Sequence, residues 1–571
     1  ESDEDQHGSE ALEGSLSALQ LEDTTEIEEV GDLSTSQLDT SAVGYPHDQS
    51  FQVLELPRGD LDSLPPISRS LYEETTECER KGWERRHQGQ EEQTDDDRWT
   101  FEQENKRQAL YRALFYPRSV IPKPDDDVDY IRASELLVEK IEEENRGQSF
   151  RDCETSERPA IFHGVFMHED VCSRADVLEY FGNGEWGVVK IKTSKTSFGD
   201  NDAYESLAFP VYVVKHCGIK VTKAAAVYAN RDFQIQMNEA AFFKRDDLTD
   251  VIFRGGVLQV LEGDQNAPKS IAHVQSVTSR AEPPPKIVVP SCKNCSFFQD
   301  CHARKLRHSI WELIRLRPER FEELKKITLE IEEIPSSFKL SQTNMIVKQS
   351  VITNSPQIKE QQLQEMFNKI VRPCFYLDFE AIQPVFPWFE GIRVYTIMVF
   401  QYSLHLETPE GTLEHREYLA DPTTDWREDL LKHLLDDLEG EGSILVYHHY
   451  EKDRLTELQK AFPAYRDRIQ RVIDRLVDVL LILNSTVYYP DFRGSYSIKK
   501  VLPVLVPAYK TAYKDLKINN GLLASVKFQM MREADLEEVS HKHHHLLHFV
   551  LLVLVFAILV PRPRPSRAMV G

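Results

Sequence analysis

The sequence predicts a mixed α/β protein with two ordered regions. Two stretches of its 571 residues, 160–230 and 373–483, alternate short β-branched or aromatic segments with longer amphipathic ones. That alternation is typical of strands and helices in an α/β unit. Three consecutive prolines at 283–285 and a group of cysteines lie between the two stretches. A hydrophobic fraction of 41% and a charged fraction of 28% are ordinary for a soluble globular protein.

The formal net charge is -26, and much of the acid lies in the first hundred residues. A uniformly acidic protein would bind nucleic acid poorly, because phosphate contacts need Lys and Arg. Residues 1–64 are rich in Glu, Asp, Ser and Thr without any sustained period, and we expect a disordered acidic tail there. Eight cysteines without a secretory-type N-terminus indicate metal binding in the cytoplasm or another reducing compartment, rather than disulfides.

The first ordered region is expected over 65–305. Helices are expected around Cys78 and Trp83, over 99–116, and over 204–217 despite Pro210. Short segments rich in β-branched and aromatic residues predict strands at 160–166, 173–180, 186–191 and 223–229. Residues 306–369 are expected to form a helical connection, with a helix over 306–333 and a polar stretch over 334–365.

The second ordered region is expected over 370–530, with three strands followed by a helix, a strand and further helices. The strands are expected at 375–379, 395–405, 414–419 and 443–447, and the helices at 425–439, 451–462 and 466–483. Residues 531–571 form a divergent apolar and Pro/Arg tail. Its apolar run 546–560 is shorter than the ~20 residues of a membrane-spanning helix, which leaves an anchor as the minor alternative.

A cysteine cluster follows the prolines. Cys292 and Cys295 form a CxxC turn, which lets two thiolates face one ion, and Cys301 lies six residues further on. Zinc and iron–sulfur clusters both take four ligands, and Cys78 is the best candidate for the fourth. The plain alternative is a coincidental group of loop cysteines. One early cysteine, a CxxC turn and a last cysteine resemble RecB-like exonucleases that carry a [4Fe–4S] cluster, which implies that cofactor here, with Zn²⁺ as the alternative.

The first region also resembles nucleases of the PD-(D/E)XK class. These nucleases place a metal-binding Asp on one strand, and an acid and a Lys on the next. Asp176 and Lys192 match the Asp and Lys positions, so the resemblance implies catalytic roles for both. Lys190 stands where the second acid belongs, and Pro210 stands at the position of an expected Gln. A cation in place of a ligand repels metal, so we expect this site to be non-catalytic, with a structural or nucleic-acid-binding role.

The second region carries an Asp-x-Glu pair, Asp378 and Glu380, on an apolar strand. Alternation along a strand puts both carboxylates on one face, where they suit a hard divalent cation. Glu451 follows the strand at 443–447 and offers a third acid, and His448 precedes it. The alternative for the pair is a strand that enters a loop, because Asp-x-Glu is common by itself.

These segments, with Gly494–Pro503, resemble a mostly bacterial uncharacterised family that joins a RecB-like region and a cysteine cluster to an RNase H-like, DEDD-type exonuclease region. The resemblance covers roughly 65–530 and implies an RNase H-like domain with a mixed central sheet. Lys499 and the helix start near it either receive a phosphate or belong to a packing turn. The family's last acidic motif is missing, and Asp478 is a substitute ligand or, more simply, a capping residue.

The expected function is a metal-dependent 3′–5′ exonuclease of DEDD type that acts on DNA or RNA. Asp378, Glu380 and Glu451 would bind Mg²⁺ or Mn²⁺ and activate water. The alternative is a catalytically inactive nucleic-acid-binding or scaffold protein, because two of the expected catalytic motifs are degraded. No protein partner is predicted by any motif.

Overall fold

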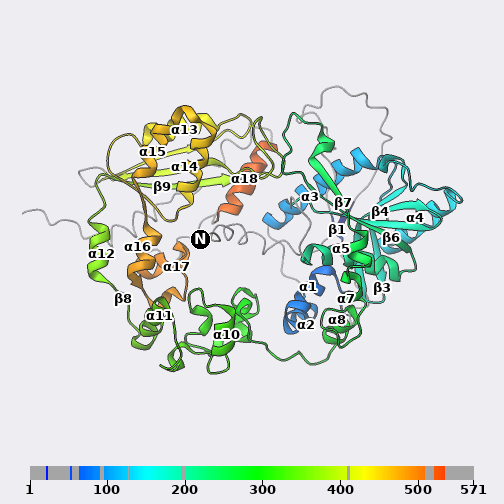
Figure 1. Cartoon of the computed structure of the whole chain (residues 1–571), viewed down its shortest axis with the longest axis horizontal. Helices are drawn as coiled ribbons and strands as arrows, with labels where there is room; N and C mark the ends of the chain where they lie inside the picture. Colours follow the sequence, from blue (N-terminus) through cyan, green and yellow to red (C-terminus); the bar gives the residue numbers. More distant parts are fainter. Residues whose placement is uncertain are drawn as a thin grey trace, which may run out of the picture. The chain divides into compact units, whose positions relative to one another are not determined.

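The computed structural model describes residues 64–89, 95–125, 128–194, 201–407, 412–507 and 520–533, and two short strands, β1 (Leu21–Asp23) and β2 (Gln52–Leu54). The chain divides into two compact units, Glu1–Ile287 and Val288–Gly571, and each has its own five-stranded mixed sheet (Figure 1). The mixed α/β class is therefore confirmed. The expected tails, including the apolar run 546–560, lie outside the described residues, apart from β1 and β2, which pair antiparallel.

The sheet of the first unit has the order β3-β4-β5-β6-β7. Neighbouring strands are antiparallel except β5 and β6, which are parallel and joined through the buried helix α5 (Asn201–His216). All four strands and the helix expected over 160–230 are present. The strands are β3 (Ala160–His168), β4 (Val171–Gly182), β5 (Glu185–Ile191), β6 (Lys220–Ala229) and β7 (Phe243–Asp247).

Helices pack around this first sheet. Cys78 ends α1 and begins α2, so the single helix expected around Cys78 and Trp83 is two. Helix α5 continues through Pro210, and its apolar residues, including Leu207 and Val213, are buried in the core of the unit. The remaining helices are α1 (Arg69–Glu77), α2 (Glu79–Gln88), α3 (Asp95–Phe115), α4 (Tyr130–Glu144), α6 (Thr249–Phe253), α7 (Val257–Leu261) and α8 (Ile271–Thr278), with 3-10 turns at Thr155–Glu157 and Glu239–Phe242.

The sheet of the second unit has the order β11-β10-β9-β12-β13. The pairs β9–β10 and β10–β11 are antiparallel, whereas β12 runs parallel to β9 and β13 runs parallel to β12. The second expected strand begins at Met398 and not at Tyr395, which has a positive φ of 59°. The strands are β9 (Cys374–Ile382), β10 (Met398–Glu407), β11 (Leu413–Leu419), β12 (Ser443–Val446) and β13 (Leu476–Asp478).

Helices of the second unit cover this sheet, and a small ladder of β8 (Gln357–Ile358) and β14 (Val487–Tyr488) lies beside them. The helices are α9 (Phe298–Cys301), α10 (Pro318–Leu324), α11 (Gln342–Thr353), α12 (Glu360–Phe367), α13 (Arg427–Asp437), α14 (Tyr450–Ala461), α15 (Arg466–Asp474), α16 (Val479–Thr486), α17 (Ile498–Leu505) and α18 (Gly521–Glu533). Turns of 3-10 type lie at Pro290–Asn294, Ala303–Lys305, Ile310–Glu312, Ile331–Glu333, Pro463–Tyr465 and Pro490–Phe492.

The prediction of one helix over 466–483 is wrong. The chain leaves α15 at Arg475, whose guanidinium donates to the carbonyl oxygens of Gly442 at 2.7 Å and Leu438 at 2.6 Å. These bonds hold the chain beside β12, where it forms the three-residue strand β13 before α16 begins. A tertiary contact therefore overrides the helical periodicity of this segment.

The prediction of one helix over 306–333 is also wrong. The segment holds two short 3-10 turns and α10, which begins at Pro318 because proline can open a helix but cannot continue one. The stretch over 334–365, expected to be a polar connection, contains α11 and α12. Val347 and Val351 of α11 are fully buried, so this helix is part of the core of the second unit.

The two faces of β9 differ in character. Phe375, Leu377 and Phe379 belong to an apolar core that includes residues of α13 and α15. Asp378 and Glu380 alternate with them and therefore occupy the opposite face, where they lie across from Ser403 and Gln401 of β10. The same face carries the buried Cys374 and Tyr376 at the start of β9, so the polar pair lies at the end of a strand that is apolar elsewhere.

Candidate functional site

Three strands of the second sheet bring acidic side chains to one place. Strands β9, β12 and β13 are mutually parallel, so their carboxyl ends lie along the same edge of the sheet. Asp378 and Glu380 lie on β9, Glu451 opens α14 just after β12, and Asp478 is the last residue of β13. The charges of Asp378 and Asp478 both act on Glu451, so the structure brings these acids together as the alternation and strand order predict.

Burial changes the acidity of this cluster. Burial raises the pKa of Asp378 from 3.8 to about 7. Burial and the nearby charge of Asp378 raise the pKa of Glu380 from 4.5 to about 8. Burial and the charges of Asp378 and Asp478 hold the pKa of Glu451 well above its usual range. Carboxyls that are costly to ionise in this way favour a cation among them.

Asp478 has a local task as well. Its Oδ1 accepts a hydrogen bond of 3.0 Å from the backbone N–H of Leu481 and caps the N-terminus of α16. The capping role that the sequence suggests is confirmed. The electrostatic effect of Asp478 on Glu451 places it beside the acid cluster at the same time.

Glu451 is 5% exposed, and its Oε2 is a buried atom without a hydrogen-bond partner in the described structure. One turn later on α14, Arg454 is 8% exposed, and its Nε and Nη1 are likewise buried without partners. Sequence reasoning missed Arg454. The signal was available, because 451, 454, 455 and 458 form the core-facing stripe of this helix, and a stripe that begins with two charged residues is unusual.

Two segments from late in the chain reach Glu380. Helix α18 begins at Gly521, where an added Cβ would stand 3.0 Å from Oε2 of Glu380. The charge of Lys499 lowers the pKa of Glu380, so the first turn of α17 also lies near the cluster. The loop before α17 is tied to the end of β12, because the Tyr447 hydroxyl donates to the carbonyl of Tyr496 at 2.6 Å.

Two further residues, Ser497 and His448, lie next to the elements that carry the acid cluster. Ser497 is the N-cap of α17, and its side chain makes no capping hydrogen bond. Burial lowers the pKa of His448, so the imidazole is neutral near pH 7. Both residues lie next to elements that carry the cluster, and the choice between phosphate binding and packing for the Lys499 segment stays a hypothesis.

The donor set of the cluster suits a hard divalent cation. Its carboxylate oxygens are the ligands that Mg²⁺ and Mn²⁺ prefer, and the orphaned Oε2 of Glu451 would gain a partner from such an ion. Within the described ranges, no group of three or more His, Cys, Asp or Glu side chains is already placed to hold a metal ion. The acids are therefore neighbours that fit the ion by chemistry, without a finished ligand shell.

In the expected site of the first unit, the candidate metal ligand Asp176 already has a cationic partner. Lys190 Nζ lies 2.9 Å from Oδ2 and 3.1 Å from Oδ1 of Asp176, which is 2% exposed, and the backbone N–H of Ile191 donates to the same carboxylate at 2.9 Å. Burial acts to raise the pKa of Asp176, but Lys190 and Arg174 outweigh burial and the pKa is lowered. The lysine at the acid's position thus forms an ion pair with the candidate metal ligand.

Helix α3 supplies further partners around Asp176. Gln108 Oε1 lies 2.7 Å from Nε2 of His163, whose pKa burial lowers to about 3. Thr193 donates to Oε2 of Glu104 at 3.0 Å. Lys192 directly follows the central strand β5 and is half-buried. Its backbone N–H donates to the carbonyl of Val227 at 2.8 Å. The motif residues are thus held within a packed polar network.

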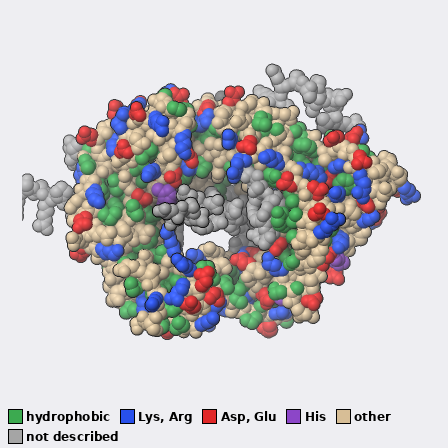
Figure 2. All heavy atoms as spheres, in the orientation of Figure 1, with side chains coloured by type: hydrophobic (Ala, Val, Ile, Leu, Met, Phe, Trp, Pro, Cys, Tyr) green, Lys and Arg blue, Asp and Glu red, His purple; other side chains and the backbone are tan. Residues whose placement is uncertain are grey.

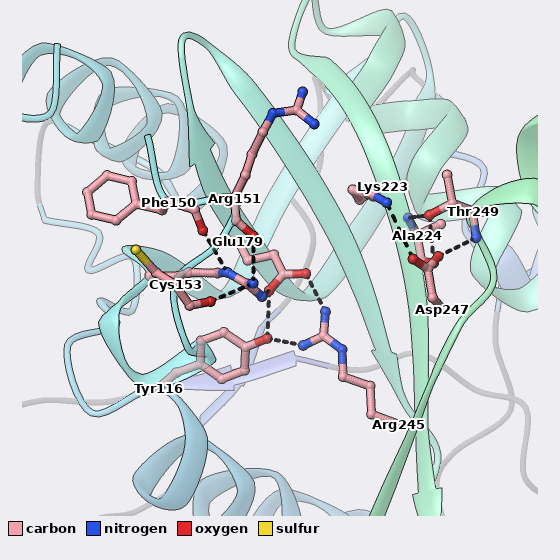
Figure 3. Close-up of polar contacts among 11 residues, drawn as sticks. Tyr116, Phe150, Arg151, Cys153, Glu179, Lys223, Ala224, Arg245, Asp247 and Thr249 are labelled. Carbon is pink, nitrogen blue, oxygen red and sulfur yellow. Dashed lines mark hydrogen bonds and ion pairs between the residues drawn. The ribbon is translucent and has the colours of Figure 1, made fainter. Parts of the chain in front are cut away.

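The first unit contains a second buried carboxylate, Glu179, to which the sequence motifs assign no role. Glu179 is 1% exposed, accepts a hydrogen bond of 2.9 Å from the Tyr116 hydroxyl, and pairs with the guanidinium of Arg245 (Figure 3). Arg158 lies 3.4 Å from the same carboxylate. Only the pairing of β6 with β7 and the fold of the loop before β3 bring these arginines to Glu179, so sequence order alone conceals the cluster.

The cysteines are divided between the two units. Cys292, Cys295 and Cys301 lie in the second unit, in a segment of 3-10 turns and the short helix α9, and all three are half-buried. Backbone bonds from Cys295 N to Cys292 O and from Phe298 N to Cys295 O, both 3.0 Å, close the CxxC turn. Cys78 lies in the first unit, between α1 and α2.

The fold and the site define a mixed α/β protein with an acid cluster at the edge of its second sheet. Residues 375–497, which contain Asp378, Glu380, Glu451 and Asp478, match the family model described as a domain of unknown function (DUF2779). Two curated relatives are similar to the chain. One is the uncharacterized protein UU173 of Ureaplasma parvum, 24% identical over 31% of this chain and 29% of its own length. The other is the uncharacterized protein MG366 of Mycoplasma genitalium, 26% identical over 28% of this chain and 26% of its own length. The chain thus spans less than a third of the length of these relatives.

Membrane association was the minor alternative in the sequence. Among the residues that the structure describes, no helix combines the length and the apolar character that crossing a membrane requires. The described face in Figure 2 shows Lys and Arg side chains interspersed with Asp and Glu. The strong net acidity of the sequence is therefore not matched by a uniformly acidic face in that view.

Proposed function

We propose that the chain is a metal-dependent nuclease of the DEDD, RNase H-like type that acts on DNA or RNA. The observation that carries the proposal is the gathering of Asp378, Glu380 and Glu451 at the carboxyl edge of parallel strands, with the buried Oε2 of Glu451 left without a hydrogen-bond partner. Acids with raised pKa values that are grouped from several elements of the fold are a common sign of a catalytic site.

The topology supports the same proposal. Three antiparallel strands, β11, β10 and β9, are followed by the parallel strands β12 and β13, with α13 and α14 between them along the chain. This order is typical of RNase H-like domains. The first unit, with β3, β4 and β5 antiparallel and β5 joined to β6 through α5, has the order typical of RecB-like PD-(D/E)XK domains. We infer both fold assignments from strand order.

The proposed reaction is hydrolysis of a phosphodiester. A divalent ion bound to these carboxylates would lower the pKa of water and offset charge on the phosphate. Asp378 and Glu380 are fixed on a strand that is buried on its other face, so their carboxylates are held in one orientation. Glu451 adds a third oxygen donor from α14, and Lys499 supplies positive charge beside Glu380.

A nuclease assay with labelled DNA and RNA in Mn²⁺ tests the proposal. We expect cleavage by the full chain and a loss of at least a hundredfold in Glu451→Gln, because one ligand and its charge are removed. Asp453→Asn is the matched control, since that acid lies on the same helix with a side chain 51% exposed, and it should retain full activity. Cleavage that survives Asp378→Ala unchanged would belong to another site or to a contaminant.

A second candidate is a protein of the same fold that binds nucleic acid without cutting it. One finding favours it: Lys190 is paired with Asp176 in the first unit. Tight binding with no cleavage in either Mg²⁺ or Mn²⁺ would select this function over the first.

For the cysteines we propose an iron–sulfur cluster that uses Cys292, Cys295 and Cys301, with Zn²⁺ as the alternative occupant. The short CxxC turn and the partial burial of its thiols support this assignment. Protein purified without oxygen should contain iron and absorb broadly in the visible range, and Cys295→Ser should lose both properties. Colourless protein with one zinc per chain would exclude the iron–sulfur cluster.

A further inference from the structure

Helix α14 buries a charged residue that the acid cluster does not require. Its core-facing positions are Glu451, Arg454, Leu455 and Leu458, and the two leucines pack into the apolar core of the second sheet. Arg454 lies among them and is 8% exposed. Burial of a guanidinium among apolar residues is costly unless its N–H groups find partners. An arginine at this position therefore calls for an explanation in function.

The hydrogen bonds of Arg454 are incomplete. Nη2 donates to Oε1 of Glu457 at 2.9 Å, and the side chain of Glu457 is 49% exposed. A side-chain hydrogen bond with Arg454 also acts to lower the pKa of Tyr450, against the larger effect of burial. Nε and Nη1 are buried and have no hydrogen-bond partner in the described structure. Native structures leave few buried donors in this condition, and such donors commonly mark a place where a ligand binds.

The unpartnered nitrogens lie beside the acid cluster. The guanidinium carbon of Arg454 stands 4.8 Å from the centre of the Tyr450 ring. Tyr450 also lies within the electrostatic reach of both Glu380 and Glu451. Arg454 thus belongs to the same corner of the second unit as the carboxylates, one helical turn from the orphaned Oε2 of Glu451.

We propose that Arg454 binds a phosphate of the nucleic-acid strand, through Nε and Nη1, next to the acid cluster. The two sets of orphaned atoms are complementary in kind. Oε2 of Glu451 is an acceptor that suits a cation, and Nε and Nη1 of Arg454 are donors that suit an anion with two acceptor oxygens. A phosphate held by Arg454 would lie beside any metal ion that the acid cluster binds. This inference rests on the proposed function for the identity of the ligand, and Arg454 then positions the strand.

Binding without divalent metal separates this role from catalysis. The affinity of the full chain for short labelled single strands of DNA and RNA is measured in chelator over a range of salt concentrations. Arg454→Met should weaken binding by about tenfold, the effect of losing a hydrogen-bonded charge. The slope of log affinity against log salt should fall by about 0.7, the value for one phosphate contact on a single strand.

Two controls keep the test specific. Glu457→Gln removes the carboxylate that accepts from Nη2 of Arg454 but leaves Nε and Nη1 unchanged, so affinity should be unchanged within twofold. Arg468→Met removes an arginine of α15 whose side chain is 36% exposed and pairs with Asp436 at 2.7 Å, and it should change neither affinity nor slope. Equal losses in Arg454→Met and Arg468→Met would overturn the proposal, because they would indicate unspecific attraction.

Arg454→Lys provides a second test if Arg454→Met fails to fold. It keeps the positive charge but loses the bidentate hydrogen-bonding geometry of the guanidinium. Its affinity should fall several-fold with the salt slope retained, whereas an affinity equal to that of the unmodified chain would sink the proposal. In a cleaving protein, both variants should raise KM more than they lower kcat. A protein that binds through Arg454 and never cleaves would refute the nuclease function and keep this inference.

Discussion

Gly521 lies directly against Glu380, because a Cβ at position 521 would stand only 3.0 Å from Oε2 of that carboxylate. The glycine is the first residue of α18 and has no positive φ, so its backbone does not require a glycine. The absence of a side chain instead leaves room for the Glu380 carboxylate. Gly521→Ala should therefore displace Glu380 by a few tenths of an ångström. We expect roughly a tenfold loss of Mn²⁺-dependent cleavage, since small misplacements of reacting groups are costly.

Stability serves as the first check on that variant. Alanine is a better helix former than glycine, so thermal unfolding of Gly521→Ala should occur at an unchanged or slightly higher temperature. Leu522→Ala changes the next residue of the same helix, which is 44% exposed, so it is the matched control and should retain activity. If both variants cleave at the rate of the unmodified chain, Gly521 does not position Glu380.

The acid cluster predicts a defined pH dependence of stability. The folded chain holds the proton of Glu380 up to about pH 8, whereas an unperturbed glutamate releases it near 4.5. A carboxyl whose pKa is raised by folding contributes stability below the unfolded value and loses it as pH rises through the folded value. Without divalent metal, the chain should therefore be less stable toward urea at pH 9 than at pH 6.

Glu380→Gln isolates that effect from other titrating groups. At low pH the free energy of unfolding of the variant should nearly equal that of the unmodified chain. At pH 9 the variant should be the more stable of the two, because its amide never ionises. Mn²⁺ should stabilise the unmodified chain increasingly from pH 6 to 9, since the ligands must lose their protons to bind the ion. A pH profile that is identical in both chains would contradict the raised pKa.

The ion pair of Asp176 and Lys190 predicts a large stability difference within the first unit. Lys190→Met leaves the buried Asp176 charge without its ion-pair partner and should destabilise the unit by about 3 kcal/mol. Adding Asp176→Asn should restore part of that loss, since the Asp176 charge is then no longer buried. Unfolding in urea, followed by tryptophan fluorescence, measures both.

Lys223 provides the matched control for this pair. Its Nζ lies 3.4 Å from Asp247 on the same sheet, with side chains 41% and 64% exposed (Figure 3). Exposed pairs contribute little, so Lys223→Met should cost less than about 1 kcal/mol. Losses of the same size in both variants would show that burial does not strengthen the Asp176–Lys190 pair.

Glu179 should be the most sensitive carboxylate of the first unit. Glu179→Gln leaves Arg158 and Arg245 without their shared anion, and we expect a cost of about 3 kcal/mol in the free energy of unfolding. Arg151→Gln alters a neighbouring arginine whose side chain is 52% exposed, and it should cost less than about 1 kcal/mol. Equal stability of the two variants would remove any structural role for the Glu179 cluster.

Local patterns in the chain anticipated much of the fold. Strands β3 to β6, the helix α5 and the strands β9 to β12 lie where their periodicity predicts them, because neighbouring residues encode which face of a strand or helix is apolar. The same alternation placed Asp378 and Glu380 together on one face of β9. The presence of Glu451 after β12 was also readable from its motif.

Tertiary structure decided the features that depend on distant partners. Arg475 bends the chain into β13 through contacts with Leu438 and Gly442, so no local period could separate α15 from α16. The fold brings Asp478 to Glu451, and it brings Gly521 and Lys499 from two later helices to Glu380. The physical reason is that the burial and the pKa of each acid depend on every group around it. Those groups come from distant parts of the sequence and meet only when the chain has folded. Sequence alone therefore names the acids, while the fold determines what charge each can carry and which neighbour it faces.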